Sequence, residues 1–357
     1  MKNLFLLGAL ALQTIVLAQS PSNIEAVEYE PAGNRWFVSN GGNTMLVTSD
    51  AGDSWEYFGS ANASYGMEIM NGVLYVLHNN AIAAYDVETA DLLGEASVTG
   101  ASFLNGMGSN ETGTLVISDF SAGRIIKVDA SNPSDMQVST LVANTGTTPN
   151  GVTIDSANDM AYVVNWGNNA DILSIDINTG EVVTVLDGSG LGNCDGIDMD
   201  SYGNFYVSSW SPARITKYNS DFSEAETVVS SGLSSPADIS YAMEIDTLAV
   251  ANSGNTQVTF HSFVTDNVGS ITNENLPWVE LKGNSLLFNL SVGGEFTLNA
   301  YSLDGKLVAS QNINLFNGAT RVELNRLSTE FANQPLINVV RASNSESITL
   351  KQGLRRL

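Results

Sequence analysis

The feature that most constrains this chain is an internal repeat. Six similar units follow one another from about residue 22 to about residue 270, and each opens on a short segment with a polar residue at its centre. These register residues recur every 40 to 45 positions and are Glu25, Tyr65, Asn105, Asn150, Asp195 and Asp238. Repeats of this length are typical of solenoids and propellers, in which each unit buries its apolar surface by packing against the next.

Each unit carries the signals of four short strands. A run of β-branched and aromatic residues follows the register residue after a turn, as in Leu115–Ile117 and Phe205–Val207. A third run such as Arg124–Asp129 comes next, and a turn such as Asn178–Gly180 leads to a fourth. Four strands in each of six units predict an all-β fold, a six-bladed β-propeller over residues 19–270.

The two ends of the chain carry different signals. Residues 1–18 combine Lys2, an apolar run from Leu4 to Leu17 and a small residue at Ala18, which predicts a cleaved signal peptide and a secreted or cell-surface protein. Residues 271–282 are predicted to form a linker. Residues 283–357 are predicted to form a small β-sandwich, because apolar and polar residues alternate in its strands and Asp304–Lys306 supplies a tight turn.

Charge is distributed unevenly along the chain, whose formal net charge is −24. Residues 19–277 contain five Lys/Arg and 32 Asp/Glu, whereas residues 278–357 contain eight and six. Such an acidic surface repels phosphate backbones and anionic lipids. Neither nucleic acid nor a membrane surface is therefore expected as a partner. No segment after the signal peptide is apolar for long enough to span a membrane. The single cysteine, Cys194, excludes an internal disulfide and a cysteine-based zinc site, and two histidines leave little material for a histidine metal site.

The register residues are the candidate functional residues. They open the innermost strand of each blade, so six polar side chains are expected to converge on the propeller axis. A second polar ring, where the next strand ends, is expected at the same mouth and consists of Asn40, His78, Asn79, Asp119, Asn165, Ser209 and Asn252. Trp166 and Trp210 follow two of these residues and are expected to form an apolar rim.

Oxygen ligands that converge on one point suit a hard divalent cation, which is expected to be Ca²⁺, with Mg²⁺ or Mn²⁺ as alternatives. The alternative is that these residues only fill a wet central channel or satisfy the loop backbone.

A family resemblance names the candidate ligands. The opening segment Glu25–Arg35, the run Pro149–Val152 and the run Asp195–Asp198 resemble motifs of the gluconolactonase/regucalcin-like propellers, which share NHL-like repeats. The resemblance implies a divalent metal held by Glu25, Asn150 and Asp195, with Asn105 contacting water or substrate. The family's basic substrate-binding residue is missing before Asn105, so neutral substrates are expected.

A second resemblance concerns the C-terminal region. The run Phe296–Val308 and the terminal strand Ser347–Lys351 look like parts of the C-terminal sorting domain of type IX secretion substrates. The resemblance implies the type IX secretion machinery as a partner.

Three functions are weighed on these observations. The leading hypothesis is a metal-dependent hydrolase of a lactone or related ester, in which Asp195 or Asp238 accepts the proton of the attacking water. The alternative is a non-catalytic surface propeller that binds a small ligand or a protein. A quinone-dependent sugar dehydrogenase is disfavoured, because the basic residues that such a cofactor needs are scarce.

Overall fold

The computed structural model describes residues 19–41, 44–49, 52–263, 279–282, 285–290, 294–301, 306–315, 318–324, 336–341 and 347–351. The chain divides into two compact units, Met1–Val264 and Thr265–Leu357. The predicted signal peptide, residues 1–18, and residues 264–278 lie outside the described residues. Within the described ranges, no helix is long and apolar enough to cross a membrane.

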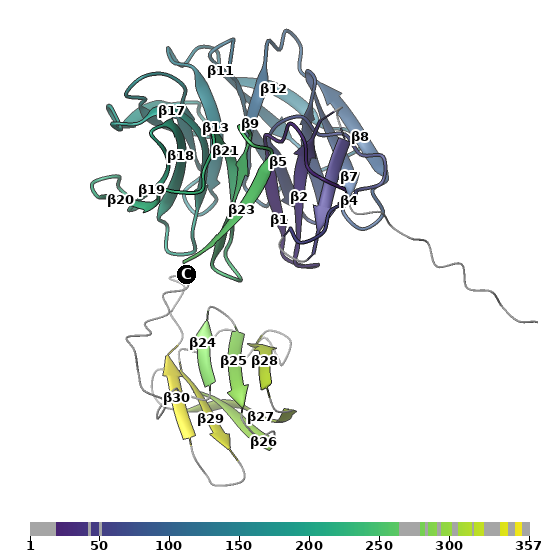
Figure 1. The fold of residues 1–357 in the computed structure, drawn as a ribbon, viewed down its shortest axis with the longest axis vertical. Coiled ribbons are helices and arrows are strands. Elements are labelled where there is room, and N and C mark those ends of the chain that lie inside the picture. Colours follow the sequence, from purple (N-terminus) through teal and green to yellow (C-terminus); the bar gives the residue numbers. More distant parts are fainter. Residues whose placement is uncertain are drawn as a thin grey trace, which may run out of the picture. The chain divides into compact units, whose positions relative to one another are not determined.

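The first unit is an all-β, six-bladed propeller, as predicted (Figure 1). Blade one contains β1 (Val27–Glu30), β2 (Arg35–Asn40), β3 (Thr44–Thr48) and β4 (Glu56–Tyr57). Blade two contains β5 (Met67–Met70), β6 (Val73–His78), β7 (Ala81–Asp86) and β8 (Leu92–Ser97). Blade three contains β9 (Leu104–Ser109), β10 (Thr114–Asp119), β11 (Arg124–Asp129) and β12 (Gln137–Val142).

Blade four contains β13 (Pro149–Asp155), β14 (Met160–Asn165), β15 (Ile172–Asp176) and β16 (Val182–Leu186). Blade five contains β17 (Gly192–Met199), β18 (Phe205–Ser211), β19 (Ala213–Tyr218) and β20 (Ala225–Val229). The described part of blade six contains β21 (Pro236–Ala242), β22 (Thr247–Asn252) and β23 (Gln257–Ser262). Strands within each blade are antiparallel and hydrogen-bonded in chain order.

Burial explains the composition of the strands. A middle strand such as β10 is covered on both faces by neighbouring blades, so five consecutive residues, Leu115 to Asp119, are buried. An outer strand such as β12 faces solvent and is mostly exposed. The middle strands therefore have nearly continuous apolar sequences, and the outer strands do not.

Adjacent blades are joined by apolar clusters, and each of the six interfaces has its own. The cluster between blades three and four, for example, joins Val116 and Ile125 to Val152 and Val163. The cluster between blades six and one joins Ala249 and its neighbours to β1 and β2. This cluster closes the ring, together with a backbone hydrogen bond of 3.0 Å from the Asp238 nitrogen to the Glu25 oxygen.

The inner strands β9, β13, β17 and β21 share an irregularity near their first residues. In β17, Cys194 pairs with Ser209 and Ile197 pairs with Val207, so Asp195 and Gly196 together oppose a single residue. The same two-against-one bulge occurs in the other three strands. A bulge of this kind redirects a side chain and bends the strand. Here it places the register residues at the axis.

The second unit consists of two antiparallel sheets. One contains β24 (Val279–Lys282), β25 (Ser285–Leu290) and β28 (Gly318–Glu323). The other contains β26 (Gly294–Tyr301), β27 (Leu307–Leu315), β29 (Leu336–Arg341) and β30 (Ser347–Lys351).

Phe288 of the first sheet packs against Phe296 of the second in a shared core, which makes this unit a β-sandwich. Residues 279–282, assigned to the linker from sequence, form the strand β24 and belong to this unit.

Candidate functional site

The bulges of the inner strands bring most register residues to one point on the axis. A small axial cavity of about 10 Å³ lies there. It is lined by Glu25, Gly66, Asn105, Gly106, Asn150, Gly151, Asp195 and Asp238. A cavity of this size holds about one water molecule or one ion. The predicted site residues Glu25, Asn105, Asn150, Asp195 and Asp238 are therefore neighbours in the structure.

Asp238 reaches the cavity from a different register than the spacing of the repeats predicts. In β21, Pro236 pairs with Asn252 and Ile239 pairs with Val250, so Ala237 takes the position that Asp195 has in β17. Asp238 takes the position of Gly196. The sixth register residue is therefore Ala237, and Asp238 enters the cavity from one position further along its strand.

Close approach of the inner strands depends on glycine. A Cβ atom on Gly106 would overlap the backbone of Asn150, and one on Gly151 would overlap the carbonyl oxygen of Asp195. Because a residue without a Cβ is needed at these contacts, each register residue stands next to the backbone of the following blade.

Amide and hydroxyl groups hold the register residues in a network. Asn105 Nδ2 donates to Asn150 Oδ1 at 2.6 Å, and Asn150 Nδ2 donates to the Cys194 oxygen at 3.1 Å. The hydroxyl of Ser118 accepts from the Gly106 nitrogen at 2.8 Å and donates to the Asn150 oxygen at 2.6 Å. The network fixes each amide across a blade boundary.

Serines are positioning residues that the sequence analysis missed. The Ser208 hydroxyl accepts from the Gly196 nitrogen at 2.7 Å and donates to the Ala237 oxygen at 2.6 Å, in the same way as Ser118. Both hydroxyl side chains are fully buried. The available signal was a serine at the end of an apolar strand, directly before a residue of the predicted second ring.

Burial shifts the carboxyl groups of the cavity toward their protonated forms, and the charges of neighbouring acids add to this shift for Asp195 and Asp238. Burial raises the pKa of the Glu25 carboxyl to about 7. Burial also raises the pKa of Asp195 well above its ordinary value, with further increases from the negative charges of Glu25 and Asp238. The Trp210 and Asn150 side chains offset part of that rise. The charged groups that shift the Asp195 pKa are both acids, so bringing the carboxylates together without a cation is costly.

The oxygen donors suit a hard cation. Glu25 and Asp195 supply carboxylates, Asn150 supplies an amide oxygen, and the cavity has ionic dimensions. Among the described residues, no three Asp, Glu, His or Cys side chains form a group that could hold an ion. The candidate set is instead a mixed one, with two carboxylates and an amide. The thiol of Cys194 is fully buried and its pKa is raised to about 12, so it is inert as a ligand.

The prediction that the second polar ring lines the mouth is wrong for its five buried members, Asn40, Asp119, Asn165, Ser209 and Asn252. Asn40, Asp119 and Asn252 are buried at 8%, 0% and 0% exposure, and they accept hydrogen bonds from the loop backbone before each inner strand. Asp119 accepts from the Phe103 nitrogen at 2.8 Å and pairs with Arg124 at 2.8 Å. Their role is to fasten the loops that carry the register residues.

The other members of the second ring also serve local structure. Asn165 donates to the Asp171 oxygen at 2.9 Å, and Ser209 donates to the Pro212 oxygen at 2.8 Å. His78 and Asn79 contact each other. These contacts stay within their own blades, and they leave the buried Asn165 Oδ1 without a hydrogen-bond partner.

A second set of carboxylates lies deeper in the channel and was also missed from sequence. Glu28, Glu68 and Asp198, here called the inner carboxyls, stand three positions after Glu25, Tyr65 and Asp195. Burial is the largest cause that raises the pKa of each, to about 6 for Asp198. For Glu28 and Glu68, the negative charges of other channel acids raise the pKa further. An acid three positions after a register residue was the available signal.

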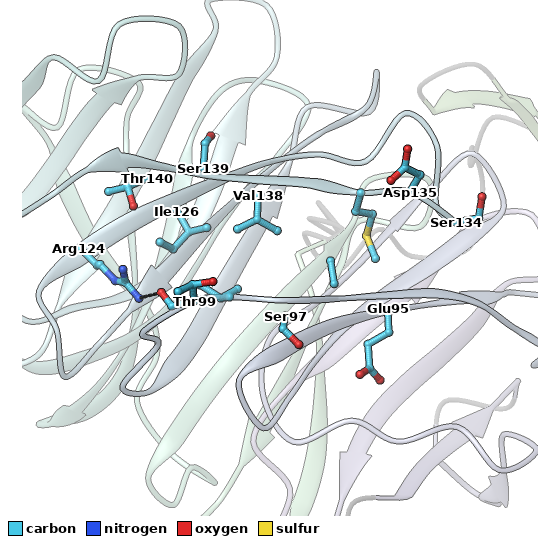
Figure 2. Close-up of a pocket in the computed structure, with 13 residues that line it drawn as sticks. Glu95, Ser97, Thr99, Arg124, Ile126, Ser134, Asp135, Val138, Ser139 and Thr140 are labelled. Carbon is cyan, nitrogen blue, oxygen red and sulfur yellow. Dashed lines mark hydrogen bonds between the residues drawn. The ribbon is translucent and has the colours of Figure 1, made fainter.

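A larger hollow of about 410 Å³ lies between blades two and three, and none of the residues that line it lines the axial cavity (Figure 2). Glu95 and Ser97 line it from β8, and Ser139 and Thr140 line it from β12. Its Arg124 is already engaged by Asp119 and by the Thr99 oxygen. Because its walls are mostly exposed strand edges without converging reactive groups, the axial cavity is the better candidate site despite its smaller volume.

Fold and site together define a six-bladed propeller with an acidic, amide-lined axial cavity. No protein-family model and no curated protein matches this sequence. Solved structures do resemble it. Regucalcin from Agrobacterium tumefaciens, described as a calcium-binding protein, is 17% identical over 66% of this chain and 84% of its own, with a TM-score of 0.50.

Virginiamycin B lyase from Staphylococcus aureus is 12% identical over 76% of this chain and 94% of its own, with a TM-score of 0.51. A streptogramin B lyase is 14% identical over 76% and 92%, with a TM-score of 0.52. At such identities the likeness shows the fold alone.

Proposed function

We propose that this chain is an exported propeller that binds a divalent cation at its mouth and hydrolyses neutral lactones or related esters there. The observation that carries the proposal is the convergence of Glu25, Asn150 and Asp195 on a cavity of ionic size. A hard cation, Ca²⁺ first, would offset the repulsion between these carboxylates. The calcium-binding description of regucalcin, a protein of the same fold, is consistent with that choice.

Each residue at the mouth has a role in this proposal. Glu25, Asn150 and Asp195 would hold the cation, and Asn105 would orient Asn150 through their 2.6 Å hydrogen bond. Bound there, the cation would polarise the ester carbonyl and stabilise the developing oxyanion. Asp238 lines the same cavity, and its pKa is raised, chiefly by burial. A raised pKa suits a carboxylate that takes a proton near neutral pH.

Asp238 can account for the proton transfers of hydrolysis. Water adds to the carbonyl carbon as Asp238 accepts a proton from it, and the ring C–O bond then breaks. The departing oxygen takes the proton back, which gives a hydroxy acid and restores the Asp238 carboxylate. The chain's acidity favours release of the anionic product.

Turnover of a neutral lactone panel by Asp238→Asn tests this proposal. We expect kcat to fall by about 100-fold, since positioned bases contribute about that much. Thermal stabilisation by calcium should persist, because Glu25, Asn150 and Asp195 are unchanged. Glu95→Gln, an exposed carboxylate on β8, is the matched control. If wild-type protein binds calcium at the mouth but turns over no lactone, the hydrolase proposal fails and a ligand-binding propeller replaces it.

A further inference from the structure

Five aromatic side chains form a continuous row on the mouth face of the propeller. Neighbouring ring centroids in this row lie 4.8, 5.4, 6.0 and 4.9 Å apart, and the neighbours meet edge to face. The row, here called the aromatic arc, consists in order of Tyr65, Phe103, Phe120, Trp166 and Trp210. It runs from blade two to blade five.

The aromatic arc lies on the face where the inner strands begin. The Phe120 nitrogen donates to the Phe103 oxygen at 2.8 Å, and the Trp166 nitrogen donates to the Thr148 oxygen at 2.8 Å, directly before β13. Tyr65 precedes Gly66, which lines the axial cavity. The arc is therefore adjacent to the cavity that holds the candidate cation ligands.

Packing of the fold does not account for the arc. Phe103, Phe120, Trp166 and Trp210 belong to none of the apolar clusters that join the blades in the described part of the chain, and Tyr65 packs only at the edge of one. All five side chains are only partly buried. A contiguous aromatic surface that stays partly exposed is a candidate contact site, because covering the exposed part gains free energy.

Both ends of the arc face a carboxylate of the axial cavity. Burial raises the pKa of Tyr65, and the charge of Glu25 raises it further. Burial also raises the pKa of Asp195, and the indole N–H of Trp210 offsets part of that rise. That indole nitrogen is buried and has no hydrogen-bond partner of normal geometry. A ligand on the arc would therefore reach the cavity at both ends.

Size and charge restrict the ligand. The axial cavity of about 10 Å³ admits an ion or a water but no organic group, so a ligand body must lie outside it, over the arc. Anions are repelled by a propeller with 32 acidic and five basic residues between positions 19 and 277. The lactones and esters of the proposed function carry no charge, so neither the acidic surface nor a cation in the cavity would repel them.

We infer that the aromatic arc binds the planar aromatic ring of a neutral aryl lactone or ester, whose carbonyl then lies over the axial cavity. This inference rests on the proposed function and names its substrate class. A polyhydroxylated sugar lactone fits less well, because the arc has few polar groups that could pair with its hydroxyls. These groups are the Tyr65 hydroxyl and the two indole N–H groups. The arc instead supplies apolar faces and edges of the kind that aromatic rings pack against.

Calorimetric titration with two stable lactams tests the inference. The probes are hydrocarbostyril, the lactam analogue of the aryl lactone dihydrocoumarin, and gluconolactam as its sugar counterpart, both in saturating calcium. Wild-type protein should bind the aryl lactam and not the sugar lactam. Trp166→Ala and Phe120→Ala should each weaken aryl binding by about tenfold, the loss of one well-packed aromatic contact.

Controls separate this inference from the cation proposal. Tyr202→Ala removes an aromatic side chain that is 85% exposed between β17 and β18, at the opposite end of the blade, and should leave the affinity unchanged. Trp166→Phe keeps an aromatic ring. It should bind the aryl lactam more tightly than Trp166→Ala does, if Trp166→Ala loses only the ring contact and keeps the fold. The calcium-induced shift in Tm should persist in all arc variants.

Two results would overturn the inference: equal affinities for the two lactams, or aryl binding that is unchanged in Trp166→Ala and Phe120→Ala. A failed cation proposal gives a different pattern. In that case Glu25→Gln leaves the calcium response unaltered, while aryl binding still depends on Trp166.

Discussion

Single hydroxyl groups hold the register residues of different blades in line. Ser118 satisfies the Gly106 nitrogen of its own blade and the Asn150 carbonyl of the next, and all three groups are buried. A buried donor that loses its acceptor keeps its full desolvation cost. The orientation of Asn150, a candidate ligand, therefore depends on a residue that never contacts the cavity.

Ser118→Ala should lower the free energy of unfolding by about 1–3 kcal/mol, the cost of an unsatisfied buried group. It should also weaken calcium binding, because the Asn150 backbone loses a partner. Urea denaturation measures the first effect and calorimetric titration the second. Ser139→Ala, an exposed serine of the same blade, should change neither. Equal stabilities of the two variants would remove the bridging role.

Sequence reasoning located most of the cavity at the residue scale. It identified Glu25, Asn105, Asn150 and Asp195 because a polar residue recurs at the start of each unit, followed by glycine in four of the six. It predicted correctly that Asp238 lies at the cavity but assigned it the wrong position in β21. The bulge in β21 sets that position, and it is known only from the backbone pairing. It also predicted that Asp119 lines the mouth. The structure shows instead that Asp119 accepts a hydrogen bond from the Phe103 nitrogen and so fastens a loop, which the sequence alone does not reveal.

At the scale of elements, the spacing between inner strands is set by residues that lack a Cβ. Each inner strand approaches the next so closely that a methyl group at Gly106 or Gly151 would overlap neighbouring backbone. Backbone cannot yield as a flexible side chain can. The periodicity of the sequence predicted six blades, and glycine after four of the register residues indicated that the backbone comes close to the axis. The backbone atoms that limit this approach, those of Asn150 and Asp195, are known only from the structure.

Gly151→Ala should therefore destabilise the propeller by about 1–3 kcal/mol, as overpacking in a tight interior does. Gly192→Ala on β17 is the comparison, since its added Cβ would meet the Ser211 side chain at 3.2 Å and no closer atom. Differential scanning calorimetry should give a clearly lower Tm for Gly151→Ala than for Gly192→Ala. Indistinguishable melting temperatures would show that the inner strands can separate at little cost.

At the scale of the whole molecule, the channel concentrates negative charge along one axis. The inner carboxyls favour their protonated forms in the folded state, because burial raises their pKa values. Their contribution to stability is therefore fully present below the unfolded pKa, near 4, and is lost as the pH rises through the folded pKa. For Asp198, whose pKa is about 6, the contribution is roughly 3 kcal/mol.

In the presence of a chelator, the Tm of the propeller should rise as the pH is lowered from 8 to 5. Glu68→Gln should flatten this dependence, because the replaced group no longer titrates. His261 acts in the opposite direction, since burial lowers its pKa and its protonation below about 6.5 favours unfolding.

Exposed carboxyls with lowered pKa values, such as Asp86 and Asp176, are ionised in both states over this range and add no slope. A Tm that falls on acidification from pH 8 to 5 would contradict the assignment of the inner carboxyls.

The C-terminal unit is proposed to direct the chain to the cell surface through the type IX secretion machinery. Its sandwich has its own core around Phe288 and Phe296, so removal of residues 279–357 should leave the propeller folded. In a type IX-competent host, the truncated protein should stay in the periplasm, and a reporter fused to residues 279–357 should reach the surface. Normal surface delivery of the truncated protein would exclude the sorting role.

The central claim is that Glu25, Asn150 and Asp195 hold one divalent cation at the axis, and calorimetric titration with calcium tests it most directly. Wild-type protein should bind one ion per chain and release protons near pH 7, because the pKa of Glu25 is about 7 and the carboxylate must be ionised to bind. Glu25→Gln and Asp195→Asn should lose this site, while Glu95→Gln retains it. Calcium titrations that are the same in all four proteins would contradict the claim.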